Sequence, residues 1–256
     1  MSLTIGRAFR VAWAVATALA VEGVVFGLAA VPAVLLLGWA AGAGTMVVAF
    51  LVGPAYVAFA VCFMLLSALA MRVLGWRSPA AAELRIADMT WPLLVWGRYL
   101  IAAYLVRIVA GALLRATPLW TMYLRLNGAR VGRGVFINSL QVSDHNLLEL
   151  GDGVVIGSDA HVSGHTVEGG VVKTGAIRLG RQVTIGVGSV IGIDVEIGPG
   201  TLVGALSLVP KHRRLDAGAM YAGVPAKRVD LKREYSHGSH DDSNAVWDAG
   251  GSGPAL

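Results

Sequence analysis

Between residues 179 and 211, an aliphatic side chain returns at every sixth position, and a glycine follows it in every block but the last. The aliphatic positions are Leu179, Ile185, Ile191, Ile197, Val203 and Val209. An amphipathic α-helix repeats every 3.6 residues and a half-buried strand every 2, so neither produces this period. A period of six with one inward aliphatic per block is typical of a parallel β-helix built from short stacked strands. The pattern therefore predicts a β-helix.

The same frame continues upstream, in Leu150-Gly151, Ile156-Gly157 and Val162-Ser163, and less regularly in Val131-Gly132 and Ile137-Asn138. We expect four coils between about residues 131 and 211. Residues 168–178 do not fit the frame and follow directly on Ser163-Gly164-His165-Thr166. Such an interruption predicts a loop that leaves the coil, and loops on rigid scaffolds often carry functional residues.

The N-terminal part has a different pattern, with two long apolar runs. Residues 11–43 contain one ionisable side chain, Glu22, and residues 44–71 contain none. About 20 apolar residues cross a bilayer, so these runs predict a hairpin of two membrane helices. Glu22 is either a polar anchor or lipid contact inside a helix bundle, or a protonated side chain near one membrane edge.

Basic residues flank the predicted hairpin, and all lie on one side of it. The positive-inside rule places that side in the cytoplasm, and the β-helix with it. The residues are Arg7, Arg10, Arg72, Arg77 and Arg85.

Residues 92–115 mix aliphatic and aromatic side chains with arginines at positions 98, 107 and 115. This composition favours an interfacial amphipathic helix, with a third membrane span as the alternative. The expected organisation is a transmembrane hairpin (1–75), a linker with the interfacial or third membrane helix (76–127), the β-helix domain (128–233) and a disordered, polar tail (234–256).

Composition agrees with a membrane protein, since 55% of the residues are hydrophobic and only 14% are charged, against about 25% charged in soluble domains. The chain carries a net charge of +5, but its basic residues are not interleaved with aromatic residues as they are on a nucleic-acid-binding surface. We therefore expect an anionic lipid or cofactor as partner and no nucleic acid. No cluster of Cys and His residues predicts a metal site, and the single cysteine, Cys62, forms no internal disulfide.

Together, the hexapeptide blocks, the histidine at the loop, the Val209-Pro210-Lys211 ending and the segment AGVPAKRV (222–229) resemble the left-handed β-helix acyltransferases. The junction TPLWTMYLRLNGARVG (117–132) resembles the membrane-to-β-helix junction in the terminal domain of epsilon-poly-lysine synthetase and related peptide-synthetase-like proteins. The first resemblance implies a homotrimer with sites between subunits.

The acyltransferase resemblance also implies site residues. His165 occupies the place of the catalytic base, which removes a proton from an acceptor hydroxyl or amine; the alternative is a polar loop residue. Asp144 and His145 are further catalytic candidates. Asn138 is a substrate-binding candidate, or else part of an asparagine ladder at a coil corner. We expect residues 138, 144 and 165 to meet in one region of the stack.

The implied co-substrate is acetyl-CoA or another acyl-CoA. Small residues at Gly186, Gly204 and Ala205 would allow its pantetheine arm to approach closely. Cationic side chains near the end of the stack would bind its phosphates. These are Lys211, Lys227 and Arg228. Many family members have tryptophan where this chain has Thr184, so cofactor packing differs here.

The leading hypothesis is a membrane-anchored acyltransferase that moves an acyl group from coenzyme A to a lipid-linked or membrane-proximal acceptor. The second resemblance favours an alternative, a transferase that forms a peptide bond from an aminoacyl thioester on a carrier protein supplied by a partner synthetase. A third hypothesis is a non-catalytic trimeric membrane scaffold.

Overall fold

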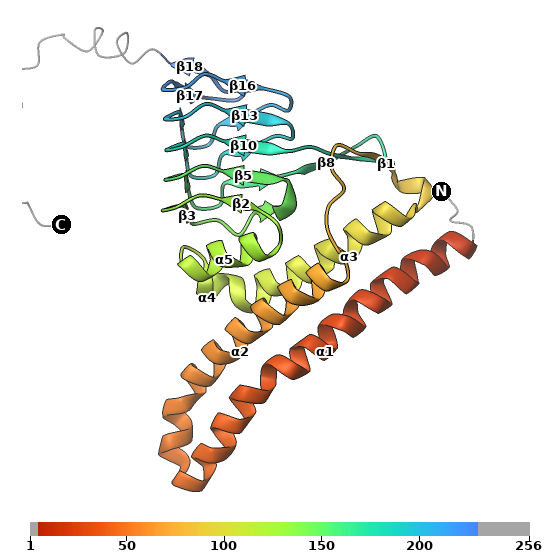
Figure 1. The fold of residues 1–256 in the computed structure, drawn as a ribbon, viewed down its shortest axis with the longest axis vertical. Helices are drawn as coiled ribbons and strands as arrows, with labels where there is room; N and C mark the ends of the chain where they lie inside the picture. The colour runs from red at the N-terminus through yellow and green to blue at the C-terminus, as the bar shows by residue number, and fades with distance from the viewer. Residues whose placement is uncertain (1–4, 230–256) are drawn as a thin grey trace, which may run out of the picture.

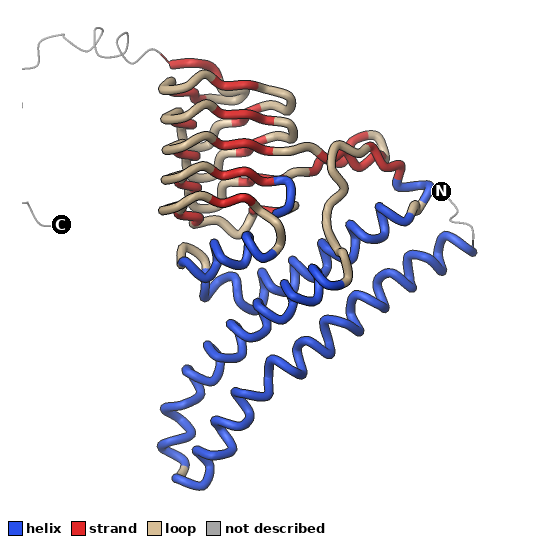
Figure 2. The backbone as a smooth tube through the Cα atoms, in the orientation of Figure 1, coloured by secondary structure: helices blue, strands red, loops and turns tan. Residues whose placement is uncertain are grey.

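The computed structural model describes residues 5–229 of the chain. Figure 1 shows long helices at one end and a stack of β coils at the other, and Figure 2 separates the two regions by secondary structure. The helical elements are α1 (Ile5–Ala43), α2 (Thr45–Val73), η1 (Ile86–Asp88), α3 (Trp91–Val106), the π-helical η2 (Arg107–Gly111), α4 (Ala112–Leu114), α5 (Pro118–Leu126) and η3 (His145–Leu147). The predicted tail, 234–256, lies outside the described residues.

Helices α1 and α2 form the predicted hairpin. They turn at Gly44, which has φ +112°, a conformation that costs little only without a Cβ. Both helices are long and apolar enough to cross a membrane, judged by length and composition. The start of α1 and the end of α2 lie toward the β coils, and the turn at Gly44 lies at the far tip (Figure 1). The basic residues that flank the hairpin are therefore on the side of the coils.

A third helix long and apolar enough to cross a membrane runs from Trp91 to Leu114 and comprises α3, η2 and α4. It packs on α1, where Nε of the buried Arg98 donates to Oγ1 of Thr17 at 3.0 Å. Length and composition thus agree with the alternative of a third membrane span at least as well as with the expected interfacial helix.

Glu22 faces the interior of the helix bundle. Its side chain is buried, and Oγ of Ser67 on α2 donates to its Oε1 at 2.9 Å. This position matches the interpretation of Glu22 as a polar anchor between helices, because a partner from the neighbouring helix reduces the cost of burying the carboxyl group.

The β coils stack on one another, and each strand of a coil pairs in parallel with the equivalent strand of the coil before it. One sheet has the order β16-β13-β10-β5-β2, a second β18-β17-β14-β11-β6-β3, and a third β15-β12-β7-β4. Their strands are β2 (Arg130–Val131), β3 (Phe136–Ile137), β4 (Val142–Ser143), β5 (Leu148–Leu150), β6 (Val155–Ile156), β7 (His161–Ser163), β10 (Ile177–Leu179), β11 (Thr184–Ile185), β12 (Val190–Ile191), β13 (Val195–Ile197), β14 (Leu202–Val203), β15 (Leu208–Val209), β16 (Arg214–Leu215), β17 (Met220–Ala222) and β18 (Lys227–Val229).

The expected fold class, apolar membrane-type helices followed by a parallel β-helix of hexapeptide repeats, is confirmed. The number of coils was wrong, since strands β16 and β17 add a fifth after the four expected between 131 and 211. This coil keeps inward side chains at Leu215 and Tyr221, both buried. The sequence pattern did not predict this fifth coil, because Asp216 and Ala222 stand where earlier blocks have glycine.

The interruption of the repeat is an ordered hairpin. Strands β8 (His165–Glu168) and β9 (Val171–Thr174) pair antiparallel, and β1 (Glu83–Arg85) adds a third strand to them. The segment after α2, expected to be a linker, therefore reaches across and holds the hairpin. Ala82 N–H donates to Oγ1 of Thr174 at 3.0 Å, which ties the same two segments together.

The first coil rests on the helices. The short α5 begins at Pro118, and the hydroxyl of Thr117 caps it by accepting from the N–H of Trp120 at 3.4 Å. Trp120, Tyr123 and Leu124 are buried beneath the coil, and Nε1 of Trp120 donates to the carbonyl of Ser139 at 3.3 Å. The docked α5 thus sets the lowest coil directly on the helical region.

Glycines at the coil corners allow neighbouring coils to touch. A Cβ on Gly186 would lie 2.6 Å from the carbonyl carbon of Gly204 in the coil above, far inside van der Waals contact. We expect Gly186→Ala to destabilise the β-helix by about 1–3 kcal/mol, the usual cost of overpacking, measured as a lower unfolding temperature in detergent. Val187→Ala, which trims an exposed neighbour, is the control. An unchanged unfolding temperature for Gly186→Ala would contradict the close stacking.

Candidate active site

His165 and Asp144 meet at the junction between the helices and the first two coils. Nδ1 of His165 lies 2.5 Å from Oδ2 of Asp144. Asp144 follows β4 in a left-handed conformation, φ 54°, which turns its side chain back under the coil. His165 is the first residue of β8, where the chain leaves the second coil. Two residues that are 21 positions apart are therefore joined by the stacking of one coil on the next.

Asp144 is fully buried and accepts hydrogen bonds from several parts of the chain. Oγ of Ser78, after α2, donates to its Oδ1 at 2.5 Å, and Nε1 of Trp96 on α3 donates to the same oxygen at 3.2 Å. Oγ of Ser143 and of Ser163 lie 3.1 Å and 3.2 Å from Oδ2. Buried carboxylates need such compensation.

These contacts keep Asp144 ionised. Burial alone would raise the pKa of its carboxyl group, but the hydrogen bond and charge of His165, with the donors Ser78 and Trp96, outweigh burial and lower the pKa. The carboxylate can then accept the Nδ1–H of His165. In that tautomer Nε2 carries the free electron pair and is available as a base.

His145 was a catalytic candidate, and the structure places it in a different environment. Its ring is buried between Tyr99 and Tyr123, with centroid distances of 5.9 Å and 5.3 Å. Its Nε2 lies 3.1 Å from the carbonyl of Val142. Burial lowers the pKa of His145 to about 4. His145 also borders the cavity beside His165, but it is only 2% exposed, so a catalytic role for His145 stays a prediction.

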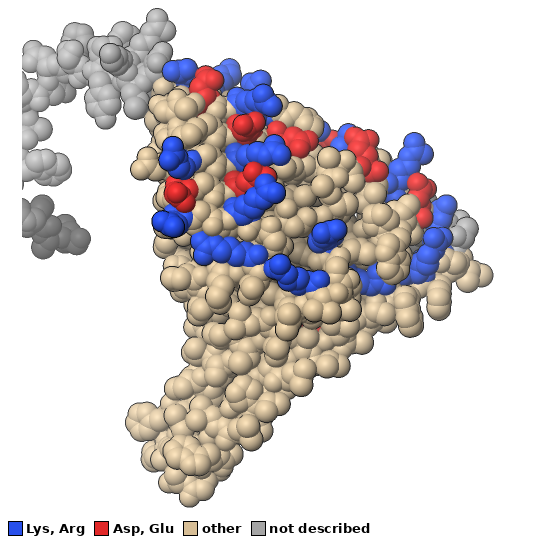
Figure 3. Space-filling model, in the orientation of Figure 1, with Lys and Arg blue, Asp and Glu red and all other residues tan. Residues whose placement is uncertain are grey.

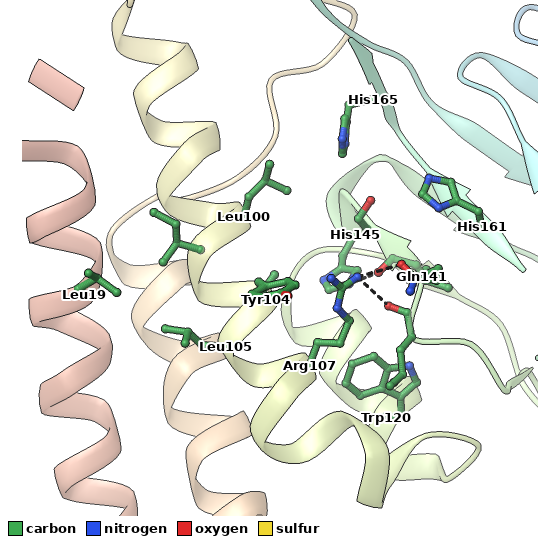
Figure 4. Close-up of a pocket in the computed structure, with 15 residues that line it drawn as sticks. Leu19, Leu100, Tyr104, Leu105, Arg107, Trp120, Gln141, His145, His161 and His165 are labelled. Carbon is green, nitrogen blue, oxygen red and sulfur yellow. Dashed lines mark hydrogen bonds between the residues drawn. The ribbon is translucent and has the colours of Figure 1, made fainter. Parts of the chain in front are cut away.

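A cavity of about 640 Å³ opens beside His165 (Figure 4). Side chains of α1 and α3 form one wall, and residues around β4 and β7 form the other. Figure 4 shows His165, His161 and Arg107 arranged around this space from different elements. The lining residues are Leu19, Leu100, Ile101, Ala103, Tyr104, Leu105, Arg107, Trp120, Leu140, Gln141, Val142, Ser143, His145, His161 and His165. The His165 side chain is 23% exposed and so is accessible from this cavity.

His161 and Arg107 form the polar end of the cavity together with His165. Burial lowers the pKa of His161, and the nearby His165 and Arg107 lower it further. Nη1 of Arg107 donates to Oε1 of Gln141 at 3.1 Å and lies 3.4 Å from the carbonyl of Leu140. His161, the first residue of β7, lines the same cavity as His165.

Asn138 does not join this group. Its backbone N–H donates to the carbonyl of Ile156 at 2.9 Å, and its side chain is not among those that line the cavity. The expected meeting of residues 138, 144 and 165 therefore holds for Asp144 and His165 alone. A substrate role for Asn138 stays a prediction.

The residues expected to bind coenzyme A lie in the upper coils, away from the helices. Gly186 stacks under Gly204 and Ala205. Nζ of Lys211 lies 2.6 Å from Oε2 of Glu168, at the hairpin. In β18, Lys227 is exposed, and Nη1 of Arg228 lies 3.4 Å from Oδ2 of Asp216. Cofactor binding by these residues stays a prediction.

Sequence reasoning missed Ser78, Trp96 and Ser163 as partners of Asp144. Ser78 stands in a segment without any repeat, and only the folded chain brings it to Asp144, 66 residues away. Arg107 was noticed as an arginine in an apolar run, and that signal could have identified it as a site residue, because a charged side chain at membrane depth is costly and usually functional. Within residues 5–229, no group of three or more His, Cys, Asp or Glu side chains could hold a metal ion.

The lowered pKa of His145 predicts a stability loss in mild acid. An unfolded histidine titrates near 6.5, and His145 in the folded chain titrates at about 4. Its neutral form thus contributes stability that is fully present above pH 6.5 and is lost as the pH falls toward 4, about 3 kcal/mol in all. We expect His145→Gln to flatten this loss in unfolding measured between pH 7 and 4. Val187→Ala, at an exposed side chain that does not titrate, should keep the wild-type slope. Equal slopes for wild type and His145→Gln would contradict the burial argument.

No family model matches the chain. A delta-poly-L-ornithine synthetase from Acinetobacter baumannii (strain AB307-0294) is 24% identical over 168 residues, which are 64% of this chain and 12% of the synthetase. This chain thus spans about an eighth of the length of that relative.

Among solved structures, a serine acetyltransferase in complex with cysteine aligns with a TM-score of 0.39 and 18% identity, over 68% of this chain and 58% of that one. A hexapeptide-repeat acetyltransferase from Vibrio cholerae, complexed with acetyl coenzyme A, aligns with a TM-score of 0.37 and 24% identity, over 40% and 60% of the two chains. The chain is thus similar to acetyltransferases and to a delta-poly-L-ornithine synthetase.

Proposed function

We propose that this protein is a membrane-anchored acyltransferase that transfers an acyl group from coenzyme A to a hydroxyl or amine of a lipid-linked or membrane-proximal acceptor. The observation that carries the proposal is the pair formed by His165 and Asp144, 2.5 Å apart, at a cavity between the helices and the first two coils. Such a pair suits general-base catalysis, and its place suits an acceptor that arrives from the membrane side.

The proposed chemistry starts with proton removal. Asp144 accepts the Nδ1–H of His165 and orients the ring, and Nε2 of His165 takes the proton from the acceptor hydroxyl or amine. The acceptor oxygen or nitrogen forms a bond to the thioester carbonyl carbon. The carbon–sulfur bond then breaks, the thiolate of coenzyme A leaves, and the proton held by His165 is returned to it.

The donor would lie along the upper coils. Its phosphates suit Lys211, Lys227 and Arg228, and its thin pantetheine arm suits the small residues Gly204 and Ala205. A homotrimer, which the sequence resemblance implies, would provide a groove between subunits for that arm. The donor sulfur and the acceptor would then approach His165 from opposite ends of the stack.

The charge distribution supports a membrane anchor with the coils on the cytoplasmic side. In Figure 3, Lys and Arg gather on the coils and at the junction with the helices, whereas the far ends of α1 and α2 carry none. Lys and Arg are favoured on the cytoplasmic side of membrane helices. The cytoplasm would also supply coenzyme A.

The likeness to a delta-poly-L-ornithine synthetase favours a second candidate, in which the donor is an aminoacyl thioester on a carrier protein and the product is a peptide bond. The same base would serve, since the amine nitrogen must give up a proton as its bond to either thioester carbon forms. Binding of a carrier protein without measurable binding of coenzyme A would favour this candidate. A non-catalytic scaffold would need neither donor.

The proposal predicts that His165→Ala abolishes acyl transfer. A general base contributes about 10²–10⁴-fold, so we expect at least a 100-fold lower rate of thiol release from acetyl-CoA when full-length protein is incubated with a membrane lipid extract. The matched control is His212→Ala, which removes an exposed histidine whose Nδ1 lies 3.3 Å from Asp194. Wild-type turnover in His165→Ala would overturn the assignment of the base.

Ser78 is expected to act as a positioning residue for Asp144. Ser78→Ala removes a donor from the buried carboxylate and so raises the pKa of Asp144. We expect kcat to fall about tenfold, within the range for losing a hydrogen bond to a charged group, and the acid limb of the pH–rate profile to move to higher pH. Ser78→Thr, which keeps the hydroxyl, should restore the profile. A uniform loss of rate with an unshifted acid limb would show a purely structural role.

A further inference from the structure

The cavity beside His165 has an apolar part and a polar part. The apolar part is formed by Leu19 on α1 and by Leu100, Ile101 and Leu105 on α3. Leu19 on α1 and Tyr104 on α3 line the cavity and are each 52% exposed, so we infer that its mouth lies between these two helices. Exposed apolar side chains continue along the outer faces of α1 and α2. In a membrane this mouth would face lipid tails rather than water, because a continuous exposed apolar surface is unfavourable in water.

Arg107 provides a positive charge at the polar part. It opens the π-helical turn η2, and such turns within α-helices are frequent at functional sites. Its guanidinium lies over the ring of Tyr104, 4.7 Å from the centroid. In residues 5–229 its hydrogen bonds run through Nη1 alone, to Leu140 and Gln141. Since guanidinium has five N–H donors, most of its donor capacity remains for a ligand.

No carboxylate of the described chain forms a salt bridge with Arg107. The described ion pairs of arginine involve Arg130, Arg178, Arg214 and Arg228, all on the coils. The carboxylate closest to the cavity, Asp144, is already bound by His165 and Ser78. A half-buried guanidinium with neutral partners next to an apolar channel is complementary to an anion attached to a hydrocarbon chain.

We propose that this cavity binds an anionic, phosphate-bearing lipid, with its acyl or isoprenoid chain between α1 and α3 and its phosphate on Arg107. Planar guanidinium binds phosphate oxygens in pairs, and the apolar wall contributes in proportion to the buried chain length. A soluble anion would gain only the first of these contributions, which is why the lipid is the favoured occupant. The polar headgroup beyond the phosphate would then face His161 and His165.

The lipid site rests on the cavity and Arg107, and only its role as acceptor rests on the proposed function. If the proposed function holds, the acceptor hydroxyl or amine belongs to the headgroup of this lipid. His161 would contact the headgroup on the side opposite Arg107. The lipid site and the acyltransferase function can be tested separately, because lipid binding is measurable without acyl transfer.

The test is native mass spectrometry of the full-length protein released from nanodiscs that contain phosphatidylglycerol and phosphatidylcholine in equal amounts. We expect retained phosphatidylglycerol to exceed retained phosphatidylcholine in the wild-type protein. Arg107→Gln should lower the retained phosphatidylglycerol at least fivefold. The matched control is Arg115→Gln, an exposed arginine eight positions on that does not line the cavity; it should leave retention within twofold of wild type.

His165→Ala separates the lipid site from the proposed function, since it should keep the bound lipid while losing acyl transfer. Equal retention of the two lipids by wild type, or equal loss in Arg107→Gln and Arg115→Gln, would overturn the lipid site and leave the proposed function standing. Should Arg107→Gln fail to fold, the comparison of the two lipids on the wild-type protein still decides. Preference for phosphatidylglycerol that free inorganic phosphate abolishes would point to a soluble anion and would also overturn the lipid site.

Discussion

The buried carboxylate of Asp144 is the interaction on which the junction between the two regions depends. A charged group without solvent is costly unless each lone pair has a donor. Here the donors come from the segment after α2, from α3, from both of the first two coils and from the hairpin that interrupts the repeat. Asp144 can therefore remain ionised only where helices and coils are docked. Its burial requires the same docking that forms the cavity.

The parts of the fold that repeat were predictable from the sequence, because each coil obeys the same local rule. An inward aliphatic every six residues fixes which side chains fill the core, and the frame from Leu179 to Val209 corresponds to strands β10 to β15. The hairpin β8–β9 was not predictable as ordered structure, because its third strand, β1, pairs with β9 across about 90 residues of sequence, as in Leu84 with Val172, and pairing over that distance leaves no local pattern. The fifth coil was missed because close stacking no longer requires glycine where the stack ends.

The sequence predicted the site residues that stand at a distinctive position relative to the hexapeptide repeat. His165 was identified by the resemblance to acyltransferases and by its place at the interruption of the repeat, and Asp144 by the resemblance alone. His145 carries the same imidazole group as His165. The two differ in exposure, since His145 is buried against Tyr99 and Tyr123 whereas the side chain of His165 is 23% exposed. Ser78 and Trp96 carry no local signal, since their role arises from the path of the chain between α2 and α3.

These contacts also give the helices a structural role at the site itself. A soluble β-helix with the same His165 would lack the Ser78 and Trp96 donors, so burial would raise the pKa of Asp144 with less to oppose it. It would also lack the wall of the cavity that α1 and α3 provide. The helical region thus supplies two of the hydrogen-bond donors to Asp144 and one wall of the cavity beside His165. The docking of the helices against the first two coils consequently produces both the buried Asp144 and the cavity beside His165.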